Sequence, residues 1–163
     1  MFARYNAWAN GRVYGCAAQL TPQSLAENRG AFFASLLGTL NHLLVTDGLW
    51  MSRLTGGTPP STRLDEILHQ DFEPLRTARE AQDQLIIGYV DALSEERLAQ
   101  TLDYTTTNGT PQSQPLHQVL AHLFNHQTHH RGQAHHLIGM ALGREKTPVL
   151  DLLAFQRTAG GAM

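Results

Sequence analysis

A long apolar stretch, residues 31–54, constrains the fold of this chain more than any other feature of its sequence. It is too long for a β-strand, which usually spans roughly 3–10 residues. Its apolar side chains would lie on most sides of a helix, and a helix of that kind is buried among other elements. The stretch therefore predicts a central helix enclosed by further helices. Its largest apolar side chains are Phe32, Phe33, Leu36, Leu37, Leu40, Leu43, Leu44, Val45, Leu49 and Trp50.

Three other segments repeat apolar residues at spacings of three and four, which is the period of one helical face. They cover roughly residues 2–20, 71–93 and 115–142. In residues 71–93 we expect Leu75 and Leu85 to face the core, whereas Arg79 and Asp83 face water. Four long helices with short links predict an all-α protein, a four-helix bundle.

Shorter signals lie between and after these helices. Thr21-Pro22 ends the first helix, residues 55–62 form a loop, and residues 94–98 add a helical turn. Asn108-Gly109 within residues 101–114 predicts a small hairpin before the last long helix. Gly143 is a suitable C-terminal cap, and residues 150–155 are expected to form a short helix that packs back on the bundle. The length fits one domain, residues 1–163.

Charge and composition exclude several classes of protein. Twelve Lys and Arg oppose fourteen Asp and Glu, so the basic footprint of a nucleic-acid-binding protein is missing. The single cysteine, Cys16, excludes an intramolecular disulfide. No apolar run is long enough for a transmembrane helix, and residues 1–10 lack the apolar core of a secretory signal. We therefore expect a cytoplasmic protein with neither a nucleic-acid nor a membrane partner.

Histidine is over-represented, with nine residues in the chain and six of them between His122 and His136. On a helix of 100° per residue, His126 lies at the edge of the apolar stripe of residues 115–142, and His130 lies inside it, about 40° away. Their i, i+4 spacing allows two imidazoles to converge on one ion, as in HExxH sites. His122 with His126, and His126 with His129, are competing pairs of similar spacing.

A third ligand is expected from a facing helix. Outside the last long helix the chain has only His42, in the middle of the most apolar segment, and His69, in a polar stretch. His42 is therefore the better candidate. The sequence predicts a divalent metal ion bound by His42, His126 and His130, although a hydrogen-bonded role for each histidine in the core stays open.

Three stretches resemble the DinB-like (DinB/YfiT) family: ARYNAWAN at residues 3–10, LNHLLVTDGLW at residues 40–50 and NHQTHHRGQ at residues 125–133. The resemblance implies a four-helix bundle with a metal held by one histidine of the second helix and two of the last, again His42, His126 and His130. It also implies zinc or nickel as the metal, a homodimer, and, from the wider superfamily, reactions that use low-molecular-weight thiols such as bacillithiol or mycothiol. Iron and cobalt also suit three imidazoles.

Three imidazoles without a protein thiolate or carboxylate leave a coordination position open, which is typical of catalytic metal sites. The leading hypothesis is a transferase or hydrolase that activates a low-molecular-weight thiol or water, acting on a small-molecule substrate that the sequence does not identify. The alternative is a non-catalytic metal-binding or scaffolding bundle. Gln133, Asn41 and Asp47 are candidates to orient the imidazoles, and Arg131 is expected to form a structural ion pair.

Overall fold

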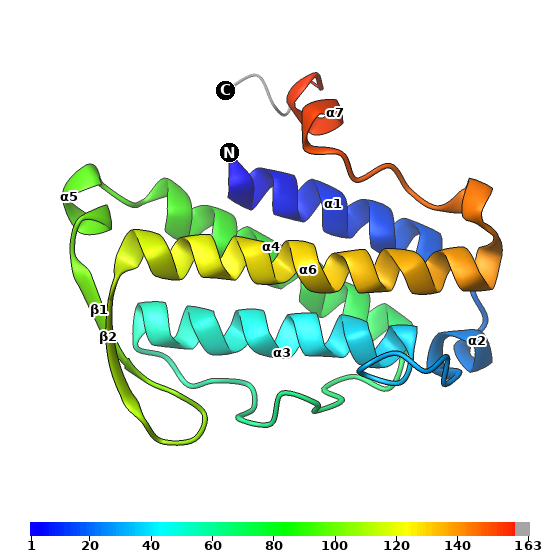
Figure 1. Ribbon diagram of the computed structural model, residues 1–163, viewed down its shortest axis with the longest axis horizontal. Helices are drawn as coiled ribbons and strands as arrows, with labels where there is room; N and C mark the ends of the chain where they lie inside the picture. Colours follow the sequence, from blue (N-terminus) through cyan, green and yellow to red (C-terminus); the bar gives the residue numbers. More distant parts are fainter. Residues whose placement is uncertain (159–163) are drawn as a thin grey trace.

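The computed structural model describes residues 1–158, in which four long helices form a bundle (Figure 1). The helices are α1 (Phe2–Ala17), α3 (Leu36–Thr55), α4 (Phe72–Asp91) and α6 (Leu116–Leu142). Each contacts two others, in the order α1, α4, α3, α6 and back to α1. Helices α1 and α6 run in one direction, and α3 and α4 run in the other. The predicted all-α four-helix bundle is confirmed. The single-domain prediction for residues 1–163 stays a prediction, and residues 159–163 lie outside the described part of the chain.

Helix α3 begins five residues later than the apolar pattern predicts, at Leu36 instead of residue 31. Ser35 is its N-cap and accepts a hydrogen bond from the Gly38 N–H at 3.0 Å. The segment before it folds back on the first turn, and a Cβ atom at Gly38 would lie 2.2 Å from the Phe33 carbonyl oxygen. This close approach needs glycine, and it places the Phe33 loop beside the helix instead of in line with it.

Short helices connect or follow the long ones. The α2 helix (Pro22–Ala26) and the α5 helix (Glu95–Leu98) are capped by the side chains of Thr21 and Ser94. After α6 come Gly143, a 3-10 turn η1 (Arg144–Lys146) and α7 (Leu152–Gln156). The ring of Phe155 on α7 contacts Tyr5 and Trp8, so the predicted terminal helix does pack back on α1.

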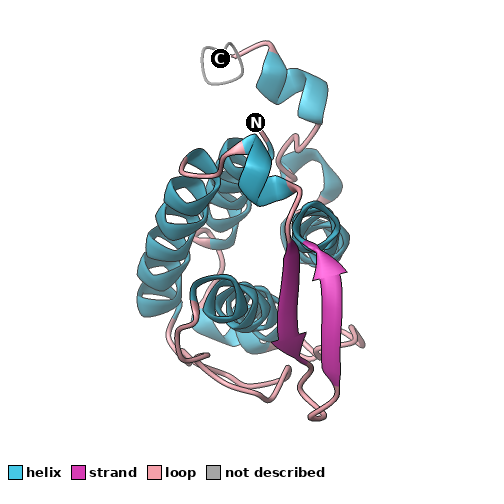
Figure 2. Cartoon of the chain, turned by 90° about the vertical axis from the view of Figure 1, so that its left-hand side faces the viewer, coloured by secondary structure: helices cyan, strands magenta, loops and turns pink. Residues whose placement is uncertain are grey.

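The predicted hairpin is present as an antiparallel pair of β1 (Thr101–Thr105) and β2 (Pro111–Pro115), which stands beside one end of the bundle (Figure 2). Gly109 has a φ of 85° in its turn, a backbone conformation that favours glycine. Tyr104 of β1 donates a hydrogen bond to Gln114 of β2 at 2.6 Å, which fixes its ring next to Trp50 of α3.

The bundle interior holds two apolar clusters at different levels along the helices. One contains Val13, Tyr14, Leu36, Leu40, Leu44, Leu75, Leu137 and Ile138. The other contains Ala3, Trp50, Ile86, Leu102, Leu116, Val119 and Leu123. In every long helix, buried polar residues lie between these two levels. We call this set the polar core cluster: Asn6, Asn10, Asp47, Arg79, Asp83, Gln127 and Arg131.

The orientation expected for α4 was partly wrong. Arg79 and Asp83 were expected to face water, but both are buried. Asp47 of α3 pairs with Arg79 in the core, and Asp83 pairs with Arg79 on the same helix and accepts a hydrogen bond from Asn10 of α1. Leu85 was expected in the core but is 61% exposed. The inward face of α4 runs instead through Leu75, Arg79, Asp83 and Ile86.

Within residues 1–158, no helix combines the length and the apolar character that crossing a membrane requires.

Candidate metal centre

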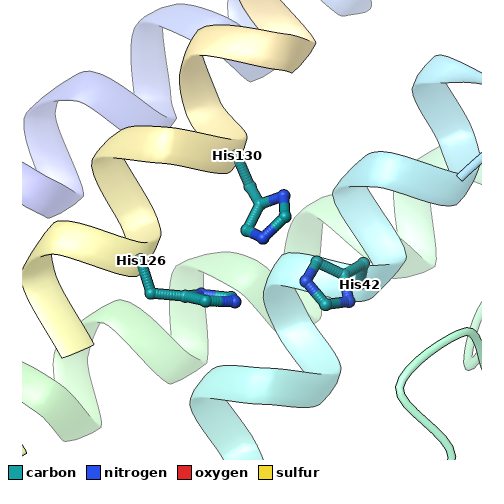
Figure 3. A group of neighbouring side chains, drawn as sticks. All are labelled: His42, His126 and His130. Carbon is teal, nitrogen blue, oxygen red and sulfur yellow. The ribbon is translucent and has the colours of Figure 1, made fainter. Parts of the chain in front are cut away.

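Three histidines from two facing helices meet between α3 and α6 (Figure 3). His42 lies on α3, and His126 and His130 lie one turn apart on α6. One nitrogen atom from each imidazole falls within 4.8 Å of the other two. We call this group the histidine centre. The structure thus brings together the three residues chosen from the sequence, and their role as metal ligands stays a prediction.

Hydrogen bonds fix the protonation pattern of two of these imidazoles. His42 Nδ1 lies 2.8 Å from the carbonyl oxygen of Leu64, and His130 Nδ1 lies 2.8 Å from Oε1 of Gln133. Both partner atoms are acceptors, so each Nδ1 carries the proton and each Nε2 keeps a free lone pair. Metal-ligating histidines are generally held in this way by a second hydrogen bond.

The free nitrogen of His42 is the strongest sign that the centre suits a metal. His42 is 3% exposed, and its Nε2 atom is buried without a hydrogen-bond partner. A buried polar atom left unpaired costs roughly 1–3 kcal/mol. Zinc lies about 2.0–2.1 Å from imidazole nitrogen, so shifts of less than about 1 Å would bring all three rings onto one ion. The residues present therefore fit a divalent ion that prefers nitrogen ligands.

Burial keeps the centre neutral. It lowers the pKa of His42 to about 4, although the hydrogen bond to Leu64 acts in the opposite direction. Burial, followed by the neighbouring His130 and His42, lowers the pKa of His126 to about 3. The pKa of His130 is lowered mainly by burial as well, against the effect of Gln133. Neutral imidazole is the form that binds metals, so the centre is in its binding form at neutral pH.

Two loops contribute contacts that the sequence did not predict. Phe33 stacks on the His42 ring with 3.8 Å between centroids and an interplanar angle of 19°, and its edge faces His130. Leu64, in the connection between α3 and α4, supplies the carbonyl for His42. Helical periodicity says nothing about loop contacts, although the two adjacent phenylalanines just before the His42 helix were a signal that was available.

The other histidines have different surroundings. The ring of His122 lies 5.2 Å from that of Trp50, and Nε2 of His129 lies 3.3 Å from the Gln133 amide nitrogen. His135 bonds the Pro148 carbonyl, and the backbone of His69 pairs with the side chain of Asn41. Within residues 1–158, His122 and His129 are not members of the three-residue group, so no fourth protein ligand closes it.

Of the three residues proposed to orient the imidazoles, only Gln133 does so. Asn41 and Asp47 are fully buried, but Asn41 bonds the backbone of His69, and Asp47 accepts a hydrogen bond from Arg79 at 2.7 Å. The ion pair predicted for Arg131 is replaced by hydrogen bonds to neutral groups. Its guanidinium donates to the side-chain oxygens of Asn6 and Asn10.

The arrangement defines a class: a four-helix bundle in which histidines of two facing helices form a group that could hold a metal ion. The chain belongs to the DinB family, which it matches over residues 1–160. It is also similar to a protein described as "Protein DinB" from Bacillus subtilis (strain 168), with 26% identity over 133 residues that cover 78% of this chain and 77% of the relative.

Proposed function

We propose that this protein is a metal-dependent enzyme that activates a small nucleophile at the histidine centre. The observation that supports it best is the set of three neutral imidazoles whose nitrogens converge within 4.8 Å, with no fourth protein ligand among residues 1–158. Closed four-ligand sites are typical of structural zinc, whereas three protein ligands and an open position are typical of catalytic zinc.

The protein's own residues have distinct parts in this proposal. His42, His126 and His130 would hold the ion, while the Leu64 carbonyl and Gln133 keep His42 and His130 in the required tautomer. A bound divalent ion would supply Lewis acidity, which lowers the pKa of a water molecule or a thiol in the open position. Phe33 covers one side of His42 and keeps water from that side.

Between the two nucleophiles we favour a low-molecular-weight thiol over water, and the reaction would then be thiol transfer to an electrophilic substrate. The support is the membership of this chain in the DinB family, since its resemblance to DinB-like proteins implies relatives in the wider superfamily that use such thiols. Zinc and nickel are the metals we favour on the same ground. Iron and cobalt also suit three nitrogen ligands and an open position.

A second candidate is a metal-binding or scaffolding bundle without catalysis. The stacking of Phe33 on His42, at 3.8 Å between ring centroids, favours it, because this contact covers part of the route to the centre. In that case the ion would stabilise the fold but would activate no nucleophile.

The first test is elemental analysis of protein purified without chelator or nickel resin. Wild type is expected to carry about one equivalent of metal, His126→Ala none, and the exposed-site control His136→Ala the same as wild type. Loss in both variants, or no metal in wild type even after reloading with zinc or nickel, would refute the metal centre.

The second test uses the metal-loaded protein. It is assayed for transfer of thiols to electrophiles and for hydrolysis of ester and amide panels. Acceleration by wild type but not by His126→Ala supports catalysis. Metal binding with neither activity supports the scaffolding bundle.

The homodimer and the cytoplasmic location stay predictions. Sedimentation equilibrium of the metal-free and metal-loaded chain decides the first, and cell fractionation the second.

A further inference from the structure

Arg53, near the end of α3, is a cation held by aromatic rings. Its Cζ atom lies 4.6 Å from the ring centroid of Trp50 and 5.1 Å from that of Tyr104 on the hairpin. The two rings themselves meet at 5.2 Å with an angle of 65°. A guanidinium that stacks on aromatic faces keeps its N–H groups at its edge available for other bonds.

Those N–H groups have no acidic partner. Among residues 1–158, Arg53 takes part in no salt bridge, whereas Arg4, Arg29, Arg63, Arg76 and Arg79 all do. It is half-buried, and burial lowers its pKa. A partly desolvated guanidinium with unused donors in a fork geometry matches the oxygen atoms of a carboxylate or a phosphate group.

A continuous row of rings joins Arg53 to the histidine centre. Trp50 contacts His122 at 5.2 Å, and His122 contacts His126 at 5.9 Å between centroids. We call Trp50, Tyr104 and His122 the aromatic strip. Arg53 follows His42 by eleven residues, which returns it to nearly the same face of α3, with a rise of about 16 Å.

We propose that Arg53 is the anchor for an oxyanion, a carboxylate or a phosphate group, at the far end of a substrate or thiol whose reacting end lies at the histidine centre. The proposal rests on the proposed function, because it assumes an open position at that centre. It adds the class of molecule: an elongated small anion that lies along the aromatic strip between α3 and α6. The fixed charge selects the anion. Contact for the part between its two ends comes from the accessible members of the strip, the half-buried Tyr104 and the exposed His122, whereas Trp50 is 9% exposed and holds the row together from inside.

The test uses zinc-loaded full-length protein and a series of ω-mercaptocarboxylates of roughly four to ten carbons, because a two-ended ligand gains affinity only when its length spans both sites. Matched ω-mercaptoalcohols lack the charge, and ω-mercaptophosphonates separate phosphate from carboxylate. Calorimetry gives each dissociation constant, and zinc is measured before and after each titration. We expect one acid of intermediate length to bind about tenfold more tightly than its alcohol, the gain typical of a charge-assisted pair.

Variants assign that gain to Arg53. Arg53→Gln should remove the advantage of the acid without changing the affinity for the alcohol, and Arg53→Lys should keep part of it because the charge remains. The matched control is Arg12→Gln, since Arg12 also stacks on a tryptophan, 4.9 Å from the Trp8 centroid, but lies on α1. Thermal melts check that each variant is folded. An advantage that survives in Arg53→Gln, or that Arg12→Gln also removes, overturns the proposal.

The thiol series also distinguishes a failure of the Arg53 proposal from a failure of the proposed function on which it rests. Alcohols that bind the zinc-loaded protein while acids show no advantage would refute the role of Arg53 alone. If no thiol binds, the thiol hypothesis fails. In that case the comparison is repeated with hydroxamates, which bind zinc without a thiol and carry the same acidic or neutral tails. Tighter binding of the acidic hydroxamates would support the role of Arg53, and equal binding of the two kinds would refute that role.

Discussion

The histidine centre and the polar core cluster lie in the same bundle, but the cluster carries charged side chains and the centre carries neutral imidazoles. In the cluster, Arg79 reaches Asp47 at 2.7 Å and Asp83 at 2.9 Å, and the amide of Asn10 bonds Asp83 at 3.0 Å. In the centre, the imidazoles are neutral, and the Nε2 atom of His42 has no partner. The cluster sets two acidic side chains, Asp47 and Asp83, against the buried arginines, whereas the centre presents neutral nitrogen atoms of the kind that bind metals.

Both sites use the same two turns of α6. His126 and His130 belong to the centre, and the next residues, Gln127 and Arg131, belong to the cluster. A step of one residue turns the side chain by 100°, so one face of the helix carries the binding atoms while the adjacent face ties α6 to α1. The comparison suggests that the cluster maintains the fold and the centre serves the function. Substitutions can separate the two.

The largest effect on folding is expected for Asp47→Ala. It removes the 2.7 Å partner of Arg79, which is 2% exposed. Asp83 still pairs with Arg79 at 2.9 Å, but the cluster is left with one buried positive charge in excess, because Arg79 and Arg131 then face Asp83 alone. Breaking such a pair typically costs about 3–5 kcal/mol, and urea denaturation measures the loss. Asp91→Ala is the control, because its 2.7 Å pair with Arg4 is exposed and contributes little. Equal losses in the two variants would mean that the cluster does not maintain the fold.

The next largest effect is expected on metal affinity, with little effect on the stability of the fold. His126→Ala should weaken zinc binding by more than about 100-fold, because a direct ligand matters more than the supporting groups whose loss costs 10–100-fold. Unfolding of the metal-free protein should change by no more than about 1 kcal/mol, since the Nδ1 atom of His126 makes no hydrogen bond that could be lost. Dye competition and urea melts measure the two quantities. If His126→Ala instead lowered the stability strongly and kept the zinc affinity, the histidine centre would maintain the fold and would not be the metal site.

The same contrast explains what could be predicted from the sequence. The three histidines lie on helices whose faces follow from periodicity, so His126, His130 and their partner His42 could be chosen without a structure. Arg79 and Asp83 could not be placed, because polarity was taken as a sign of exposure. Their burial depends on groups of other helices that no local pattern reveals.

The loop contacts of the centre do not follow from helical periodicity. Phe33 reaches His42 only because its segment folds back at Gly38, and Leu64 acts through a backbone carbonyl that any residue could supply. Gln133 was within reach, since it follows His130 by three residues on the same helix and so lies on a neighbouring part of the same face.

Gln133→Leu sharpens the comparison further. It removes the 2.8 Å hydrogen bond to Nδ1 of His130 but leaves all three imidazoles in place. Zinc affinity should fall by about tenfold, the lower end of what such supporting groups contribute. Gln118→Leu, at an exposed position of the same helix, is the control and should leave the affinity unchanged. An unchanged affinity in Gln133→Leu would show that packing alone orients His130.

The smallest change is expected on acidification. The folded-state pKa values of His42, about 4, and His126, about 3, lie below the unfolded value near 6.5. The unfolded chain therefore binds more protons between these limits, so the metal-free protein should lose stability as the pH falls below about 6.5. Zinc affinity should hardly change, because the folded imidazoles are already neutral. From pH 7 to 5.5 we expect a loss of less than about tenfold, against several hundredfold for three imidazoles of ordinary pKa. Dye competition at several pH values measures the zinc affinity. A loss of several hundredfold would show that the imidazoles are as solvated as free histidine.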